Sequence, residues 1–326
     1  MKWFAKYVFF ILLISLISLN IHAQGLRGKR ICIDPGHGGT AATDSYRVGS
    51  AGEREEWINL RVATYLRDLL LKEGAEVLLT RDSDVFVEIG ERAKMAKDFK
   101  SDLFISIHHN ASADTSANFP IIYFHHSAKE NIGSVVFSKL LVKSFLKEIY
   151  PKNHKKYAIV SDQLIFPKSG AGVIRNSYGI PGVISEASFF SNPSEELRLK
   201  DTTYNKREAD AYLSAIRSFF KKTYPIHPKM DSDILQLAVN QEAARMDKSA
   251  LLWKNHLNDA EAIIMKKEVE QYPKAEELLL SILKIFPDNY KVVDVYQNLL
   301  KLYKLTGDKD KYQQMKKRFD HFVVKL

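Results

Sequence analysis

The sequence predicts an α/β fold: a mostly parallel, twisted sheet flanked by helices, phosphorylase/hydrolase-like, followed by a small all-α C-terminal domain. Short apolar segments alternate with amphipathic helical segments through the first two thirds of the 326 residues, as in parallel sheets with helical crossovers. Beyond Pro225 and Pro228, only helical periodicity remains. The composition, with 45% hydrophobic and 27% charged residues, is typical of globular proteins.

The first two thirds of the chain contain six expected strands and four expected helices. Strands are expected at 31–33, 75–79, 103–107, 121–124, 157–160 and 182–185. Helices are expected at 53–73, 88–98, 132–149 and 194–221. The first helix has the clearest pattern, because Ile58, Val62, Leu66 and Leu69 fall on one stripe and Gly74 can end it.

The first 23 residues have the pattern of a signal peptide. Lys2 and Lys6 provide a charged start, residues 8–19 are apolar or serine, and Ala23 precedes a polar residue. The apolar run is shorter than the roughly 20 residues that a membrane span requires. We therefore expect cleavage after Ala23 and export to the periplasm or cell envelope, with the extracellular space as the alternative. An uncleaved segment would instead anchor the chain in a membrane.

The charge of the chain favours an anionic partner. The net charge is +9 and the isoelectric point is about 9.2, and such an excess attracts polyanions. The basic residues are dispersed along the chain, so a nucleic-acid groove is not predicted. The single cysteine, Cys32, lies in the first expected strand. An intramolecular disulfide is therefore excluded, and we expect a buried thiol.

These patterns divide the chain into a signal peptide at 1–23, an α/β domain at 24–223 and a helical domain at 224–326. The last two helices are expected at 290–305 and 309–323. Helix pairs of this length resemble tetratricopeptide repeats, although the signature residues are incomplete. We expect the helical domain to bind a protein partner rather than to carry chemistry, and we expect the α/β domain to fold without it.

Candidate metal ligands follow three of the expected strands. His37 follows the first strand in the loop 34–39, His108 and His109 follow the third, and Glu186 ends the last. The carboxyl ends of parallel strands meet at one edge of the sheet, where α/β proteins bind ligands. A catalytic zinc ion needs about three nitrogen or oxygen ligands and one open position. Taken alone, His37 could equally be a histidine in a tight turn.

The helix after the first loop offers three glutamates. At about 100° per residue, Glu55 lies roughly 35° from the centre of the apolar stripe, Glu56 about 135° away and Glu53 nearly opposite. We therefore expect Glu55 alone to point into the protein, where a metal or a buried arginine would be its partner. His108 and His109 face opposite sides of the sheet, and strand alternation does not say which joins the site.

The segment Asp34-Pro35-Gly36-His37-Gly38-Gly39 resembles the opening motif of zinc-dependent N-acetylmuramoyl-L-alanine amidases of the Amidase_3 family. The resemblance continues in order through Glu55 with Asn59-Leu60, and through 79–81, 91–93, 106–111 and 181–193. It covers about 30–222, so the domain at 24–223 would be the zinc amidase domain.

The resemblance implies roles for individual residues. His37, Glu55 and His108 would be the zinc ligands, which settles the choice of His108 over His109, and Glu186 would be the catalytic glutamate. Two further residues are candidates for substrate binding. These are Arg175, which matches an arginine position before the catalytic strand, and Asn110, which lies in a matching segment.

The implied reaction is hydrolysis of the amide between N-acetylmuramic acid and L-alanine of the peptidoglycan stem peptide, in wall remodelling or daughter-cell separation. Zinc lowers the pKa of its water from 15.7 to about 7 and polarises the scissile carbonyl, and Glu186 would accept the proton of that water. A zinc amidohydrolase of the same fold acting on soluble muropeptides and a non-catalytic wall-binding adaptor are the alternatives. The retention of all four residues favours an enzyme.

Overall fold

The computed structural model describes residues 25–39, 47–167, 169–227, 237–241 and 245–326. The predicted signal peptide at 1–23 lies outside these residues. Among the helices that are described, none is long and apolar enough to cross a membrane.

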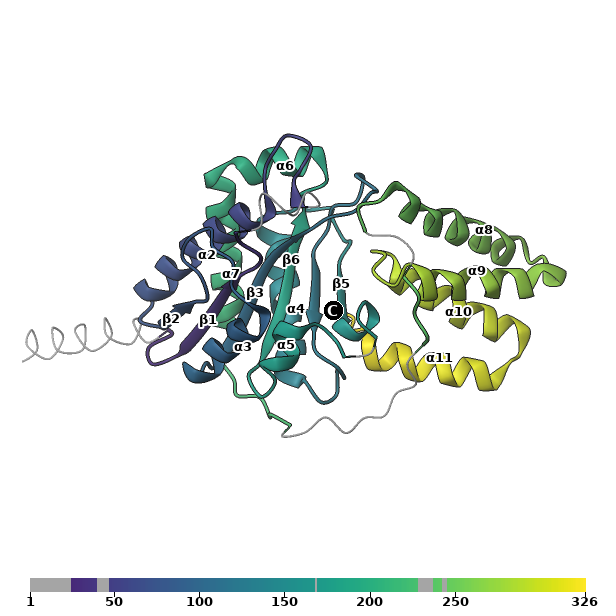
Figure 1. Ribbon diagram of the computed structural model, residues 1–326. Helices are drawn as coiled ribbons and strands as arrows, with labels where there is room; N and C mark the ends of the chain where they lie inside the picture. Colours follow the sequence, from purple (N-terminus) through teal and green to yellow (C-terminus); the bar gives the residue numbers. More distant parts are fainter. Residues whose placement is uncertain (1–24, 40–46, 168, 228–236, 242–244) are drawn as a thin grey trace, which may run out of the picture.

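A six-stranded sheet forms the centre of the described part of the chain (Figure 1). The strands are arranged in the order β2-β1-β3-β6-β4-β5. The first four of these are mutually parallel, whereas β4 runs antiparallel to β6 and parallel to β5. The prediction of a mostly parallel sheet flanked by helices is therefore confirmed. The strands are β1 (Arg30–Pro35), β2 (Glu76–Leu79), β3 (Leu103–Asn110), β4 (Ile121–Phe124), β5 (Ala158–Ser161) and β6 (Gly182–Phe189).

Helices cover both faces of the sheet (Figure 1). One face carries α2 (Glu55–Lys72), α4 (Ile132–Glu148) and α7 (Thr202–Phe219). The other face carries α3 (Ile89–Asp98) and α5 (Gly172–Asn176). The division follows from strand alternation.

The strand β1 illustrates this alternation. Ile31 and Ile33 pack in the core beneath α2, α4 and α7, whereas Cys32 is buried in the core on the opposite face. On the neighbouring strand, Phe104 shares the face of Cys32. The two faces of each strand therefore belong to different cores, and the expectation of a buried thiol is confirmed.

Four helices of the C-terminal region lie beside the β5 edge (Figure 1). Trp253 and Phe322 of this region belong to the same buried cluster as Tyr123 and Phe189 of the sheet, and the partly buried Tyr290 packs against it. The α/β part and the helical region therefore share one apolar core. The helices are α8 (Leu252–Lys266), α9 (Tyr272–Ile285), α10 (Val292–Thr306) and α11 (Lys309–Phe322).

The end of the chain extends the sheet at β5. Val323 forms an antiparallel bridge with Val160, and the Val324 N–H donates to the Ile159 carbonyl at 2.9 Å. This contact occupies backbone groups that an edge strand would otherwise leave unpaired.

Two expectations about element boundaries were wrong. The strands β3 and β6 continue to Asn110 and Phe189, so His108 and Glu186 lie inside the strands rather than at their ends. The single helix expected at 194–221 is two helices, α6 (Pro193–Lys200) and α7. Asp201 between them is extended, and its carboxylate caps α7 by accepting from the Thr203 N–H at 2.8 Å.

Candidate metal centre

The loop between β1 and α2 carries His37 toward the carboxyl ends of the strands. His37 itself has φ of 62°, in the left-handed region, which few residues other than glycine adopt. Gly36 is required for a different reason. A Cβ atom at Gly36 would lie 2.2 Å from the ring of His108. The absence of a side chain at this position therefore allows the two histidines to approach each other.

Two arginines fix the backbone of this loop. The Arg81 Nε donates to the Pro35 carbonyl at 2.8 Å, and the Arg92 Nη2 donates to the His37 carbonyl at 2.6 Å. Arg92 also pairs with the buried Asp34 at 2.8 Å. Both arginines lie in segments that resemble the family, but the sequence did not suggest a role for either. The available signal was the position of Arg81 directly after β2 and of Arg92 within α3. They act by positioning the loop that carries His37.

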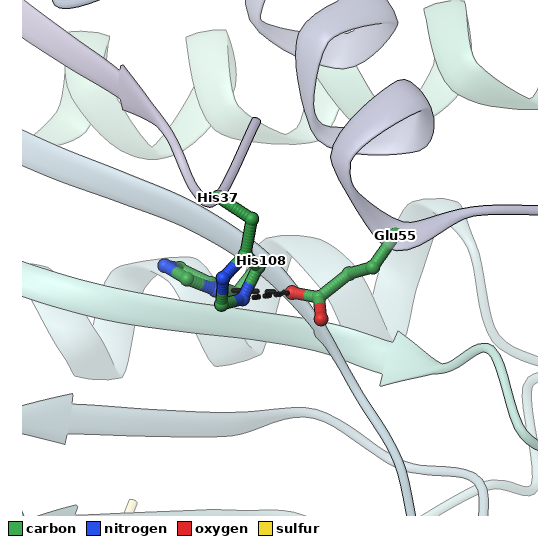
Figure 2. A group of neighbouring side chains, drawn as sticks. All are labelled: His37, Glu55 and His108. Atoms are coloured by element: carbon green, nitrogen blue, oxygen red, sulfur yellow. Dashed lines mark hydrogen bonds and ion pairs between the residues drawn. The ribbon is translucent and has the colours of Figure 1, made fainter. Parts of the chain in front are cut away.

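His37, Glu55 and His108 converge on one point (Figure 2). The Oε1 atom of Glu55 lies 3.1 Å from Nε2 of His37 and 3.0 Å from Nδ1 of His108. One ligand atom from each of the three residues lies within 4.8 Å of the other two. The structure therefore brings together the three residues that sequence analysis selected as metal ligands.

The expectation that Glu55 alone points into the protein was wrong, because Glu53 and Glu56 are also buried. Each of those two has an arginine partner: Arg61 lies 2.7 Å from Glu53, and Arg54 lies 2.6 Å from Glu56. Glu55 makes no ion pair with lysine or arginine within the described residues. Its carboxylate instead faces two imidazoles, which distinguishes it from its neighbours.

His108 and His109 face opposite sides of the sheet, as strand alternation requires. His109 is buried on the side of α2 and α7, where Nδ1 lies 2.8 Å from Oδ1 of Asn59 and Nε2 lies 3.1 Å from Oε2 of Glu208. Burial lowers the pKa of His109, but the Glu208 carboxylate, together with Glu55 and Glu186, raises it on balance. The His109 ring therefore lies in a buried network on the other face of the sheet. That network joins the site at Glu55, because the His109 N–H and the Asn59 amide each donate to Glu55 Oε1 at 3.3 Å.

The protonation states of the cluster suit a divalent metal. Burial alone would raise the pKa of Glu55, but the neighbouring His37 and the hydrogen bonds from both imidazoles lower it well below its ordinary range. Burial lowers the pKa of His37. Glu55 is thus ionised and His37 neutral at neutral pH, the states that ligate metals. Two imidazoles and one carboxylate are a donor set found in catalytic zinc sites.

Glu186 lies directly beside His108 on the neighbouring strand. The two residues are register partners in the parallel pair β3 and β6, so their side chains share a face. The Oε2 atom of Glu186 is buried and has no hydrogen-bond partner within the described residues. Burial raises the pKa of Glu186, and the nearby Glu55 carboxylate adds to the increase. A basic, unpaired carboxylate therefore stands next to the three candidate ligands.

These four residues line one cavity of about 320 Å³. Its lining also includes Arg245 and Met246, which belong to the C-terminal region. Sequence analysis did not identify Arg245 as a site residue. Other lining residues include Arg47, Tyr123, Ile165, Phe166 and Phe190.

The two residues proposed for substrate binding do not line this cavity. The amide oxygen of Asn110 accepts from the Ala111 N–H and from Arg245 Nη1, both at 2.8 Å. Arg175 lies on α5 and donates to the Gly170 carbonyl at 3.3 Å. Asn110 therefore supports a cavity residue, and a direct role of either residue in substrate binding stays a prediction.

Comparison with known proteins identifies relatives of this chain. Residues 31–218 match the Amidase_3 family, described as N-acetylmuramoyl-L-alanine amidase. The probable cell wall amidase LytH of Staphylococcus epidermidis is 27% identical over 201 residues, which cover 62% of this chain and 62% of that protein. The match thus spans less than two thirds of the relative's length.

Solved structures share the fold. The N-acetylmuramoyl-L-alanine amidase AmiC2 of Nostoc punctiforme has a TM-score of 0.51 at 24% identity, covering 60% of this chain and 98% of AmiC2. The CwlD amidase from Clostridioides difficile, solved with the GerS lipoprotein, has a TM-score of 0.52 at 23% identity, covering 60% and 99% respectively. At these identities the likeness shows the fold alone.

Proposed function

The chain belongs to the Amidase_3 family of N-acetylmuramoyl-L-alanine amidases, and on that premise we propose that it is a zinc-dependent peptidoglycan hydrolase. The bond cleaved is the amide between the lactyl group of N-acetylmuramic acid and L-alanine of the stem peptide. The observation that carries the proposal is the grouping of His37, Glu55 and His108 within 4.8 Å, beside the unpaired carboxylate of Glu186.

The three grouped residues would hold the metal. Their donor atoms are close enough to share one ion. The Asn59 amide donates to Glu55 Oε1 at 3.3 Å, and the Ser106 hydroxyl lies 3.1 Å from His108 Nε2. Such supporting contacts orient ligands. When bound, zinc supplies Lewis-acid chemistry, lowering the pKa of water from 15.7 to about 7 and polarising a carbonyl.

Glu186 would act as general base and then as general acid. It accepts a proton from the attacking water as the water oxygen bonds to the scissile carbonyl carbon. It returns that proton to the alanine nitrogen as the C–N bond breaks. The raised pKa of Glu186 supports both roles, because a proton acceptor works best when its pKa approaches the working pH.

The location and partners of the protein follow from the substrate. We propose export to the periplasm or cell envelope, because peptidoglycan lies outside the cytoplasm and residues 1–23 have the pattern of a signal peptide. The net charge of +9 suits an anionic wall polymer. We further propose that the C-terminal helices, which resemble tetratricopeptide repeats, present a surface to a protein partner.

Digestion of purified peptidoglycan tests the function. The protein is incubated with and without a chelator, and the products are identified by mass spectrometry. We expect free stem peptides that begin with L-alanine, formed only in the absence of chelator or after zinc is restored. Products cut within the peptide or the glycan chain, or unchanged hydrolysis in chelator, would contradict the proposal.

A further inference from the structure

Arg245 joins the candidate active site from outside the family match, which ends at residue 218. It lines the same cavity as Glu186 and the three candidate ligands. Burial lowers the pKa of Arg245, but the acidic groups around it, including Asp288 and Glu186, raise it on balance, so Arg245 stays charged next to the site. The C-terminal region thus contributes a cation to a cavity built by the sheet.

Three contacts hold Arg245 in this position. Its Nη1 atom donates to the Asn110 side-chain oxygen at 2.8 Å, and its Nε atom lies 3.5 Å from Oδ2 of Asp288. Its backbone carbonyl accepts from the Ala113 N–H at 3.1 Å. The guanidinium is therefore fixed between the end of β3 and the loop that connects α9 to α10.

The contacts of Arg245 show that it lines the cavity and does not block it. Within the described residues, no ion pair links Arg245 to Glu186 or Glu55, and its Nη2 atom makes no hydrogen bond. The side chain retains 28% exposure, and about 320 Å³ of space remains beside it. A side chain that blocked the cavity would pair with Glu186 or Glu55 and fill this space. Arg245 instead lines a cavity that stays open, and one of its guanidinium donors has no partner within the described residues.

We propose that Arg245 binds the free carboxylate of the second residue of the stem peptide. This inference rests on the proposed function. Stem peptides are rich in carboxylates, and a planar guanidinium is well suited to bind them. Because the cavity also holds Glu186 and the candidate ligands, a group bound by Arg245 must lie near the scissile amide. The first free carboxylate after that bond meets this condition.

The proposal gives the C-terminal region a part in specificity. Recognition depends on Arg245, and its orientation depends on Asp288 of the helical region. A site arranged to pair with a carboxylate discriminates against a ligand that lacks the charge, because the guanidinium is then left without its partner. The enzyme should therefore distinguish muropeptides whose second residue is free from those in which it is amidated.

Binding measurements test this idea separately from catalysis. The probe is N-acetylmuramoyl-L-alanyl-γ-D-glutamyl-L-lysine with the α-carboxyl of its glutamyl residue either free or amidated. Calorimetry measures the affinity of both probes for full-length Glu186→Gln protein and for the same protein with Arg245→Gln added. We expect Arg245→Gln to weaken binding of the free acid about 10- to 100-fold and to change binding of the amide less than threefold.

Two further variants separate recognition from structural support. Arg245→Lys keeps the charge and should restore part of the preference for the free acid. Arg217→Gln removes an arginine that pairs with Glu73 on the surface and does not line the cavity, and it should leave both affinities unchanged. Equal losses for both probes in Arg245→Gln would overturn the proposal in favour of a structural role. Tighter binding of both probes in that variant would overturn it, because it would mean that Arg245 blocks the cavity.

The result of the binding test does not depend on whether the protein hydrolyses peptidoglycan. If the protein binds the free acid through Arg245 but its Glu186-containing form releases no L-alanine-terminated peptide, the proposed amidase function fails and the binding proposal stands. If hydrolysis occurs and the two probes bind equally to the Arg245-containing protein, the amidase function stands and the role of Arg245 is refuted.

Discussion

At the scale of single residues, the candidate site depends on how closely two histidines can approach. Gly36 leaves the space that the His108 ring occupies, since a Cβ at this position would lie 2.2 Å from the ring. Buried atoms at such a distance must move apart. The geometry of the ligand group is therefore set partly by a residue that contributes no ligand.

Substitution of this glycine should damage the site more than the fold. We expect Gly36→Ala to displace the ring of His108 and to lower zinc affinity about 10- to 100-fold, the range typical of changes to groups that orient metal ligands. Competition with a fluorescent chelator measures this affinity. Gly90→Ala is the matched control, because no atom lies near its added Cβ. Equal zinc affinity in both variants would show that the approach of His108 is not limiting.

The site residues that could be predicted from sequence are those marked by a pattern in the neighbouring residues. His37 stands among glycines, and Glu55 lies at a computable angle on a helix. The angle alone was an incomplete guide, because Glu53 and Glu56 are buried as well and are neutralised by arginines. Helical periodicity predicts which face of the helix a residue occupies. It does not predict which charged residue packs against that face.

At the scale of elements, the site lies on the face of the sheet that the helical region also contacts. Asp114, in the loop between β3 and β4, accepts from Lys254 Nζ and Tyr290 Oη, both at 2.6 Å. Burial alone would raise the pKa of Asp114, but these bonds and that from Ser116 hold it well below its ordinary range. One carboxylate thus links a sheet loop to both α8 and the loop before α10.

Removal of this charge should loosen the attachment of the helices. We expect Asp114→Asn to reduce the free energy of unfolding by about 1–2 kcal/mol at pH 7, because two charge-assisted hydrogen bonds are weakened and Lys254 is partly exposed. Since the folded pKa lies below the unfolded value of about 3.9, this contribution is present above that pH and decreases as the pH falls further.

Denaturant unfolding of both proteins between pH 7 and pH 3 measures the effect. The difference between wild type and Asp114→Asn should be largest near neutral pH and should shrink below about pH 4. The exposed ion pair between Lys94 and Asp98, at 2.5 Å, supplies a control, since Asp98→Asn should leave the stability almost unchanged. A difference that grows toward low pH would exclude the proposed linkage.

At the scale of the whole molecule, the chain is more integrated than its sequence suggests. The sequence pattern changes abruptly near Pro225, which predicts two domains. In the structure, Trp253 and Phe322 share a buried cluster with Tyr123 and Phe189, and Val323 pairs with β5. The change of pattern marks a change of element type rather than the end of a core.

Truncation after residue 223 should therefore be costly. The shortened protein would expose the apolar face around Tyr123, Val160 and Phe189, and it would lose Arg245 from the cavity. We expect lower soluble yield and a lower melting temperature than for the protein ending at residue 326. A truncated protein with the same melting temperature and the same affinity for muropeptides would restore the independent domain that sequence analysis expected.

The part played by Arg245 could not have been predicted from sequence. The alternation of strands and helices is a local signal, so the sheet and its order of elements were accessible. The position of Arg245 depends on how the helical region packs against the β5 edge, which no local pattern specifies. The same limit applies to Asp288, whose relation to Arg245 exists only in the folded chain.

The central claim is that three residues hold a metal while Glu186 moves the proton. One preparation of Glu186→Gln tests both halves, with metal content measured by mass spectrometry and hydrolysis measured on purified peptidoglycan. We predict about one zinc per chain, as in the wild type, and hydrolysis reduced about 10²- to 10⁴-fold. Hydrolysis at the wild-type rate, or a wild-type protein that is active without bound metal, would contradict the account.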